Sequence, residues 1–407
     1  MNMKKIWSAG LAAAVSGCML FAQPASADTV LAPENGPEPI YNADGYDISG
    51  FAYRFPEKFS KDDTVTVTDR SYQSHDINIS ITEHRFDRMT GDVDENGLVD
   101  MHDAVSLCRL LAEDGTLSCT ETGIQNADIT EDGSLAWDDV NRLLNYLAQE
   151  IPDADFYVDH TLVYFVADVY LRDLHSFRGG FAGGQYTLPS NAITEEVLDM
   201  AKANNAIFAI NCDYVAHRTN GITYRNGVMY REDPSTYKKE VCVLYKDGVM
   251  DVLTDAQYRK LTEEQKANIW QTSAFAPGLV KDGVLVSGMK GQLAQLHPRS
   301  GVGYYEPGHY VFVQVEGRQK GYSAGIVLDD FAKLFYDLGV SEAYNLDGGS
   351  SSVITFMDAE VNRPAWSGRK SSDILYICEL SQIPFDTAAA AFLAQQQNSD
   401  TEPAPES

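Results

Sequence analysis

The stretch DVDENGLVDMHD, Asp92–Asp103, recurs farther along the chain as DITEDGSLAWDD, Asp128–Asp139. A 12-residue calcium loop takes side-chain oxygens from positions 1, 3, 5, 9 and 12, a backbone carbonyl from position 7 and a sharp turn from glycine at position 6. The first stretch fills all of these positions. The repeat predicts two Ca²⁺ ions, bound by Asp92, Asp94, Asn96, Leu98, Asp100 and Asp103 in the first loop and by Asp128, Thr130, Asp132, Ser134 and Asp139 in the second.

The second loop departs from the pattern at its third and ninth positions. Thr130 is a weaker ligand than a carboxylate, and Ala136 offers no side-chain oxygen, so that a water molecule must complete the shell. We therefore expect the second loop to bind calcium more weakly than the first.

Each loop ends in Asp where an ordinary calcium-binding helix-loop-helix has Glu, and each continues into a segment with apolar residues at helical spacing. The apolar positions are Ala104, Leu107, Leu110 and Leu111, then Val140, Leu143, Leu144 and Leu147. Residues 88–151 thus resemble an all-α type I dockerin. The resemblance implies a cohesin domain of a scaffolding protein as partner; the alternative is a purely stabilising calcium module.

The N-terminus resembles a secretory signal. Lys4 and Lys5 precede the apolar run Ile6–Ala22, and Ala25 to Ala27 provide small residues for cleavage. We expect residues 1–27 to be removed and the protein to be secreted, associated with a cellulosome at the cell surface. A lipoprotein anchored at Cys18 is the alternative. No later segment has the ~20 apolar residues that a membrane span needs.

The net charge bears on the possible partners, and the number of cysteines bears on the possible disulfides. The formal net charge of -28 argues against nucleic acid, because binding to phosphate backbones requires clustered Lys and Arg. Five cysteines remain after signal cleavage, an odd number that excludes a complete disulfide framework. A Cys108–Cys119 disulfide and five unpaired thiols both remain open.

Strand patterns on both sides of the calcium loops indicate an insertion. Residues 76–82 alternate apolar and polar side chains, and residues 162–171 are rich in β-branched and aromatic residues. We expect one α+β domain with a mixed or antiparallel sheet, made of residues 28–87 and 152–382, with the calcium loops between two neighbouring strands. The alternative is three successive domains. For residues 383–407 we expect a frayed helix and then a disordered tail.

Within this α+β domain, helical patterns cover residues 194–204 and 327–338, and strand patterns cover 206–211, 241–245, 310–315 and 374–378. Polar residues follow several of these strands. Three clusters result, at residues 211–214 with His217, Arg218 and Arg225, at 298–301 with 316–318, and at 344–352.

The sequence NLDGGSSS, Asn345–Ser352, ends a strand in a turn. Its two glycines allow positive φ and direct successive N–H groups and serine hydroxyls toward one point, which suits an anion. The turn lacks the lysine of a phosphate-binding P-loop and the G-x-S-x-G spacing of a serine hydrolase. Nucleotide binding and serine hydrolysis are therefore disfavoured.

In this order the three clusters resemble the phosphodiester glycosidase family, over roughly residues 76–377. The family includes the lysosomal enzyme that removes N-acetylglucosamine from a phosphodiester, so the resemblance implies cleavage of a sugar-1-phosphodiester. Three positions depart from the family pattern: Cys212 replaces a usual Gly, Glu316 a usual Asp, and Ser350 a common third Gly.

Arginine forks suit phosphate oxygens, and carboxylates suit proton transfer. We expect Arg299 and Arg318 to bind phosphate, Asp347 to act as general base or nucleophile, and Asp213 or Glu316 to act as general acid. Expected substrate-binding residues are Asn211, Arg299, Arg318, Asn345, Gly348, Gly349, Ser350, Ser351 and Arg369. The alternative function is a non-catalytic module that binds sugar phosphates.

Overall fold

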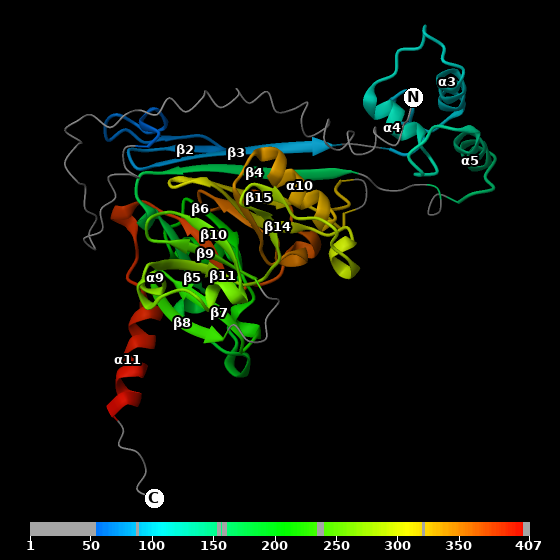
Figure 1. Cartoon of the computed structure of the whole chain (residues 1–407). Coiled ribbons are helices and arrows are strands. Elements are labelled where there is room, and N and C mark those ends of the chain that lie inside the picture. The colour runs from blue at the N-terminus through cyan, green and yellow to red at the C-terminus, as the bar shows by residue number, and fades with distance from the viewer. Residues whose placement is uncertain are drawn as a thin grey trace, which may run out of the picture. The chain divides into compact units, whose positions relative to one another are not determined.

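The computed structural model describes residues 54–86, 89–152, 156, 161–233, 240–319 and 322–401 (Figure 1). The expected signal peptide, residues 1–27, lies outside the described residues. The chain divides into two compact units. We call the unit that contains Arg85–Val163 and Arg318–Gly325 the calcium-loop unit, and the unit that contains Leu31–His84, Tyr164–Gly317 and Ile326–Ser407 the main domain.

The largest sheet has nine strands among the described residues, in the order β1-β2-β3-β4-β15-β14-β16-β12-β13. The strands are β1 (Thr66–Val67), β2 (Ser71–Gln73), β3 (Ile77–Phe86), β4 (Leu162–Leu171), β12 (Gly278–Lys281), β13 (Val284–Leu285), β14 (Arg299–Glu306), β15 (His309–Val315) and β16 (Glu342–Asn345). The sequence of β4, LVYFVADVYL, is apolar on both faces and is buried along nearly its whole length. Strands β3 and β4 are neighbours, and the calcium loops lie in the segment that joins them.

A second sheet supplies the other strand ends of the candidate site. Its order is β18-β17-β6-β19-β5. The strands are β5 (Phe177–Phe181), β6 (Phe208–Asn211), β17 (Ile354–Phe356), β18 (Ala359–Glu360) and β19 (Asp373–Ile377). Helix α7 (Val197–Ala203) packs on β6 and β19, and Met200 and Ala201 enter a core with Ile374 and Tyr376.

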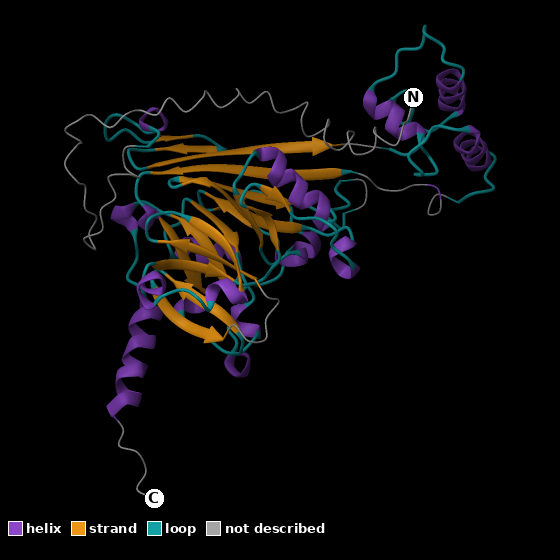
Figure 2. Cartoon of the chain, in the orientation of Figure 1, coloured by secondary structure: helices purple, strands orange, loops and turns teal. Residues whose placement is uncertain are grey.

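Smaller elements complete the main domain. A three-stranded sheet contains β9 (Glu240–Tyr245), β10 (Met250–Thr254) and β11 (Ile269–Ser273), and β7 (Gly221–Arg225) pairs with β8 (Val228–Asp233). Two short helices, α8 (Asp255–Tyr258) and α9 (Glu263–Ala267), follow β10. The pairs whose registers are defined are antiparallel. Strands dominate this unit (Figure 2), and it is an α+β domain.

Helix α10 (Leu328–Leu338) packs against strand β14. A Cβ atom on Gly301 or Gly303 would lie 2.8–2.9 Å from the ring of Phe335, so that glycine at both positions lets the helix approach the strand. Buried Phe331 and Phe335 fill this interface. The expected helix at residues 327–338 is confirmed, and the close approach explains why two glycines stand within a buried strand.

The sequence predicts a frayed helix and then a disordered tail for residues 383–407, and helix α11 occupies Thr387–Thr401 of this segment. Ala388 is buried, and the ring of Phe392 lies 4.7 Å from that of Tyr230. Asp386 accepts a hydrogen bond from the N–H of Ala389 (2.9 Å) and so caps the first turn. The end of the predicted tail, residues 402–407, lies outside the described residues.

The calcium-loop unit contains helices α3 (Met101–Leu111), α4 (Glu121–Ala127) and α5 (Trp137–Leu147). The first and third follow the two loops, as the apolar spacing predicts; α4 is an additional helix, which Thr120 caps through Gly123 N. Leu107 and Leu143 pack in one core with Phe156. The five described cysteines are unpaired thiols, so Cys108 and Cys119 form no disulfide.

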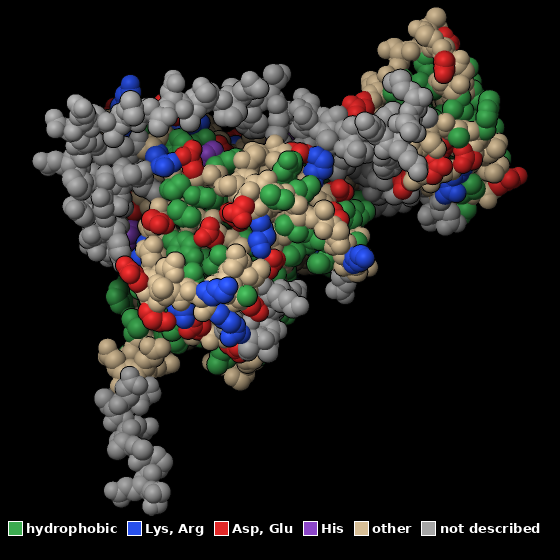
Figure 3. Space-filling model, in the orientation of Figure 1, with side chains coloured by type: hydrophobic (Ala, Val, Ile, Leu, Met, Phe, Trp, Pro, Cys, Tyr) green, Lys and Arg blue, Asp and Glu red, His purple; other side chains and the backbone are tan. Residues whose placement is uncertain are grey.

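No helix in the described part of the chain combines the length and the apolar character needed to cross a membrane. On the face of the main domain shown in Figure 3, acidic and basic side chains are interspersed.

Candidate functional site

The two calcium loops adopt matching backbone conformations. Glu95 and Glu131, at the fourth loop position, both have φ 58°, while Gly97 and Gly133 have φ 85° and 83°. In each loop the glycine N–H donates to the first aspartate over 3.0 Å. The left-handed glycine therefore produces the same turn in both loops.

The first loop fits a calcium ion. One carboxylate oxygen each from Asp92, Asp94 and Asp103 lies within 4.8 Å of the others, the spread expected of ligands at about 2.4 Å from one cation. Burial and the negative charges of Asp103 and Asp94 raise the pKa of Asp92, which a bound cation would counteract. Asp100 also caps helix α3 by accepting from His102 N (2.7 Å).

In the second loop, backbone N–H groups hold the carboxylate of the last predicted ligand. The carboxylate of Asp139 accepts from Ile129 N (2.8 Å) and Ala136 N (2.9 Å). Among the described residues, only the first loop brings three carboxylates together as a cation site. This difference agrees with the replacement of carboxylates by Thr130 and Ala136 in the second loop.

In the main domain, Asp213 lies just beyond strand β6 in a fully buried ion pair. Arg218 donates to both of its carboxylate oxygens (2.6 and 2.5 Å), and Ala274 N donates over 2.9 Å. Burial alone raises the pKa of Asp213, but the Arg218 guanidinium outweighs it and lowers the pKa to about 2. Asp213 therefore remains ionised, and these contacts argue against the expected role as general acid.

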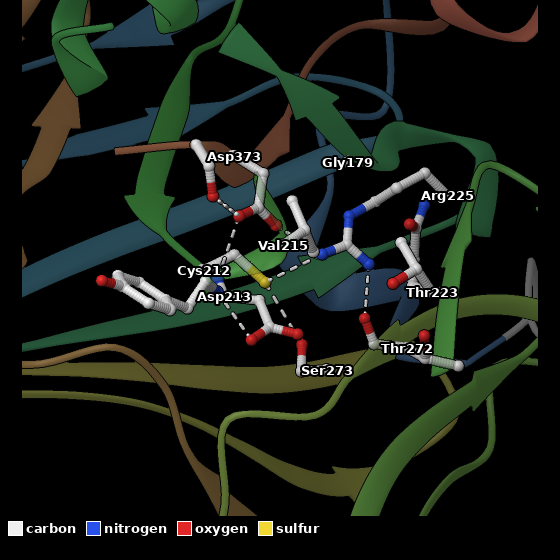
Figure 4. Close-up of polar contacts among 12 residues, drawn as sticks. Gly179, Cys212, Asp213, Val215, Thr223, Arg225, Thr272, Ser273 and Asp373 are labelled. Atoms are coloured by element: carbon white, nitrogen blue, oxygen red, sulfur yellow. Dashed lines mark hydrogen bonds and ion pairs between the residues drawn. The ribbon is translucent and has the colours of Figure 1, made fainter. Parts of the chain in front are cut away.

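A second buried ion pair joins Arg225 and Asp373, beside Cys212 (Figure 4). The Cys212 sulfur lies 3.2 Å from the hydroxyl of Ser273 and 3.5 Å from Nη2 of Arg225. Burial raises the pKa of the Cys212 thiol well above its usual value, which keeps it protonated. Cys212 is therefore a packed structural thiol.

Asp347 lies beside this buried cluster at the end of strand β16. Its backbone N–H donates to the carbonyl of Cys212 over 2.9 Å. Arg369 donates to its carboxylate (3.0 Å) and to the hydroxyl of Ser351 (2.8 Å). Burial raises the pKa of Asp347, although Arg369 opposes this shift. The Arg369 side chain is 52% exposed, so this cluster reaches the surface.

The glycine turn after Asp347 is held by close backbone contacts. A Cβ on Gly348 would lie 2.9 Å from the carbonyl oxygen of Pro298, and Gly349 has φ 67°. The N–H of Gly349 donates to that same carbonyl (2.9 Å), and Ser352 N donates to Gly349 O (3.2 Å). The N–H groups of Gly349 and Ser352 are therefore used within the fold. Ser350, in the same turn, is partly exposed.

The side chains of Asn211 and Asn345 are buried and form hydrogen bonds within the fold. The amide of Asn211 donates to Asp347 O (2.5 Å) and accepts from the Ser300 hydroxyl (2.8 Å). Asn345 donates to Ala276 O over 2.9 Å. Both side chains are at most 1% exposed. They position the turn that carries Asp347, and neither presents its amide at the surface.

The two expected phosphate-binding arginines have different surroundings, and Arg299 lies next to the glycine turn, where a Cβ on Gly348 would be 3.8 Å from its Cα. Arg299 is 6% exposed and donates to backbone carbonyls, among them Gln295 O (3.0 Å) and Ile326 O (3.3 Å). Arg318 is exposed and belongs to the calcium-loop unit. Glu316, 1% exposed, accepts a hydrogen bond from Arg363 N. These contacts give Arg299 and Glu316 structural roles.

Arg218 and Arg225 belong to the first polar cluster, but the sequence predicts no role for them. Residue spacing does not show that they are buried beside Asp213 and Asp373. The sequence also does not single out the exposed Trp366, because an exposed ring has no distinctive sequence pattern.

The fold and these two sites define a protein with an acid-and-arginine cluster on an α+β domain and a paired calcium-loop module. Residues 204–378 match the phosphodiester glycosidase family, and residues 90–148 match the type I dockerin domain, which confirms both resemblances. Type I dockerins generally bind calcium.

The chain is also similar to individual proteins. It is 34% identical over 169 residues to the SPbeta prophage-derived uncharacterized protein YomE of Bacillus subtilis, a match that covers 39% of this chain and 25% of YomE. The chain thus spans about a quarter of the length of this curated relative.

Two solved structures are similar. The catalytic domain of zebrafish N-acetylglucosamine-1-phosphodiester alpha-N-acetylglucosaminidase, auto-inhibited by its pro-peptide, has 20% identity and a TM-score of 0.45, covering 56% of this chain and 80% of that domain. A hypothetical protein from Synechocystis has 13% identity and a TM-score of 0.42, covering 54% and 62%.

Proposed function

We propose that this protein is a secreted glycosidase that hydrolyses a sugar-1-phosphodiester, such as an N-acetylglucosamine-1-phosphodiester of a cell-surface glycopolymer. The observation that carries the proposal is the Asp347–Arg369 pair, where a carboxylate with a raised pKa meets a half-exposed guanidinium. This pair combines an anion-binding group with a proton-transfer group at the surface of a domain that matches phosphodiester glycosidases.

Substrate binding explains how Asp347 becomes an acid. A phosphodiester that attracts Arg369 removes the cation that lowers the pKa of Asp347 and brings a negative charge close to it. Both changes raise the pKa further, so Asp347 binds a proton. It then protonates the oxygen that joins C1 of the sugar to phosphorus, while Arg369 binds the nonbridging oxygens.

Cleavage of the C1–O bond releases a phosphomonoester. A water oxygen forms the new bond to C1, and the water proton returns to the Asp347 carboxylate, which completes the cycle. Asp213 remains an ionised positioning residue, because Arg218 and backbone amides occupy its carboxylate. This assignment gives Asp347 the acid role that sequence reasoning gave to Asp213 or Glu316.

We propose further that residues 88–151, within the calcium-loop unit, form a dockerin that binds two Ca²⁺ ions and attaches the enzyme to a cohesin domain of a cellulosome-type scaffold. The match to type I dockerins and the matching turns at Gly97 and Gly133 support this proposal. The position of this dockerin between strands β3 and β4 supports its insertion into a glycosidase domain made of residues 28–87 and 152–382.

Phosphorus NMR on the mature protein in calcium tests the reaction. We expect wild type to convert a sugar-1-phosphodiester to the monoester, and Asp347→Asn to lower kcat by about 10²–10⁴-fold. Asp358→Asn is the matched control, because Asp358 is exposed at a left-handed turn that Asn tolerates. Binding of the diester without conversion by wild type would instead favour a non-catalytic sugar-phosphate module.

A further inference from the structure

Trp366 is the feature of the main domain that the proposed chemistry leaves unused. It lies in the short turn η9 (Ala365–Ser367), and the residue is 73% exposed. Trp366 and the next residue, Ser367, have φ 56° and 64°, a left-handed conformation that bulky residues rarely adopt. Because the ring is exposed, its burial does not offset the energetic cost of this backbone conformation. Such conformations are concentrated at functional sites.

The loop that carries Trp366, residues 362–369, is anchored firmly at its start. The Asn362 side chain donates to Ser352 O (3.0 Å) and accepts from Ile354 N (2.8 Å). The next residue, Arg363, donates its backbone N–H to the buried carboxylate of Glu316. Glu316, expected from sequence to be a catalytic acid, therefore holds this loop in place.

The end of the same loop joins the candidate active site. Arg369 donates to Asp347 and Ser351. Turn η9 also packs against η8 (Gly349–Ser351), the turn that follows Asp347. Only three peptide bonds separate Trp366 from Arg369, so their Cα atoms are at most about 11 Å apart.

We propose that Trp366 is the stacking platform for the pyranose ring of the substrate, and that Glu316 is a positioning residue for this platform. The inference rests on the proposed function and specifies its substrate as a pyranosyl-1-phosphodiester. The phosphate meets Arg369, and the apolar C–H face of the adjoining sugar covers the indole ring. The exposed ring thereby selects for a sugar on the phosphate that Arg369 binds.

Tryptophan fluorescence and steady-state kinetics of the mature chain test the platform. The mature chain keeps three tryptophans, of which Trp270 is 4% exposed and Trp137 lies in the calcium-loop unit. The probes are methyl N-acetylglucosamine-1-phosphodiester and, without a sugar, inorganic phosphate. The variants are Trp366→Ala and Trp366→Phe, with Trp137→Ala as the matched exposed control.

We expect the diester to quench wild-type fluorescence, and Trp366→Ala to abolish the quench. KM should rise about tenfold with kcat within about twofold, as expected when one stacked ring is lost. Trp366→Phe should restore most of the affinity, Trp137→Ala should behave as wild type, and phosphate binding should be equal in all four proteins.

The outcomes separate the platform from the hydrolysis. Turnover by wild type with an unchanged KM in Trp366→Ala overturns the platform and leaves the proposed function standing. A Trp366-dependent quench without turnover supports the platform and overturns hydrolysis. Neither quench nor turnover overturns both.

Glu316→Gln tests the positioning role. The substitution weakens the hydrogen-bond acceptor for Arg363 N. It should therefore raise KM for the diester and shift the fluorescence emission of Trp366, and leave the pH profile of kcat unchanged. A large fall in kcat at wild-type KM, with an altered pH profile, would make Glu316 a catalytic acid and overturn its positioning role.

Discussion

The backbone N–H of Asp347 donates to the carbonyl oxygen of Cys212 over 2.9 Å. Asp347 follows strand β16 of the nine-stranded sheet, and Cys212 follows strand β6 of the five-stranded sheet. This hydrogen bond joins the two sheets just beyond the ends of these strands, where each chain segment carries an aspartate, Asp347 and Asp213. The backbone of Asp347 is therefore fixed by the turn that precedes the buried Asp213.

Gly348→Ala should destabilise the main domain by about 1–3 kcal/mol, because the new Cβ would lie 2.9 Å from the carbonyl of Pro298. Chemical denaturation measures this loss. Ser350→Ala, in the same turn, is the control and should stay within about 0.5 kcal/mol of wild type. Equal stability of Gly348→Ala and wild type would show that the turn relaxes around the methyl group.

Asp373→Asn should destabilise the main domain by about 3–5 kcal/mol. It removes the charged partner of Arg225, which is 1% exposed and keeps its charge at every accessible pH. The exposed Arg70–Glu83 pair gives the matched control, since Glu83→Gln should cost less than about 1 kcal/mol. Similar losses in both variants, measured by urea denaturation, would contradict this burial argument.

Acid stability should depend on Asp213. Its pKa is about 2 in the folded protein against 3.8 as the usual value, so the folded state binds the proton less readily than the unfolded state. The resulting stabilisation, about 2 kcal/mol, is complete above pH 3.8 and is lost as the pH falls through about 2.

Urea denaturation at several pH values compares wild type with Asp213→Asn. The variant should be less stable near neutrality and should lose less additional stability between about pH 4 and 2. Parallel curves for the two proteins would show that other carboxylates cause the acid sensitivity.

Calcium binding should occur in two unequal steps, the stronger in the first loop. Ala136→Asp supplies the missing oxygen at the ninth position and should strengthen the second step by about tenfold. Isothermal titration calorimetry of the chelator-treated protein measures both steps. Identical affinities for the two loops in wild type would contradict the assignment of Ala136 as the weak point.

Chelation itself should unfold the calcium-loop unit, because Asp92, Asp94 and Asp103 then repel one another around an empty centre. Circular dichroism should show a loss of helix that added calcium reverses. Retention of the full helical signal in chelator would show that the apolar core around Leu107 and Leu143 suffices.

Sequence patterns predicted the long elements because their apolar spacing is regular. Strand β4 and helix α10 lie where the patterns place them. Helix α11 is harder to predict, because few of its side chains, among them Ala388 and Phe392, contact the main domain. Such a short contact gives a weak periodic signal.

The candidate site was predicted in its location more than in its roles. Motif order brought Asp213 and Asp347 into one region, and the hydrogen bond between their turns agrees with this. The sequence could not show that Arg299 donates hydrogen bonds to backbone carbonyls or that Arg218 forms an ion pair with Asp213. Those outcomes depend on burial and on partners distant in the chain, which residue types do not encode.

The calcium loops lie in the segment between strands β3 and β4, which are neighbours in the sheet. A module attached at a chain end is released by one proteolytic cut in its linker. Here the module has two covalent connections to the sheet, so a single cut on either side leaves the other connection intact. The proposed anchorage to a scaffold should therefore survive nicking that would detach an enzyme with a terminal module.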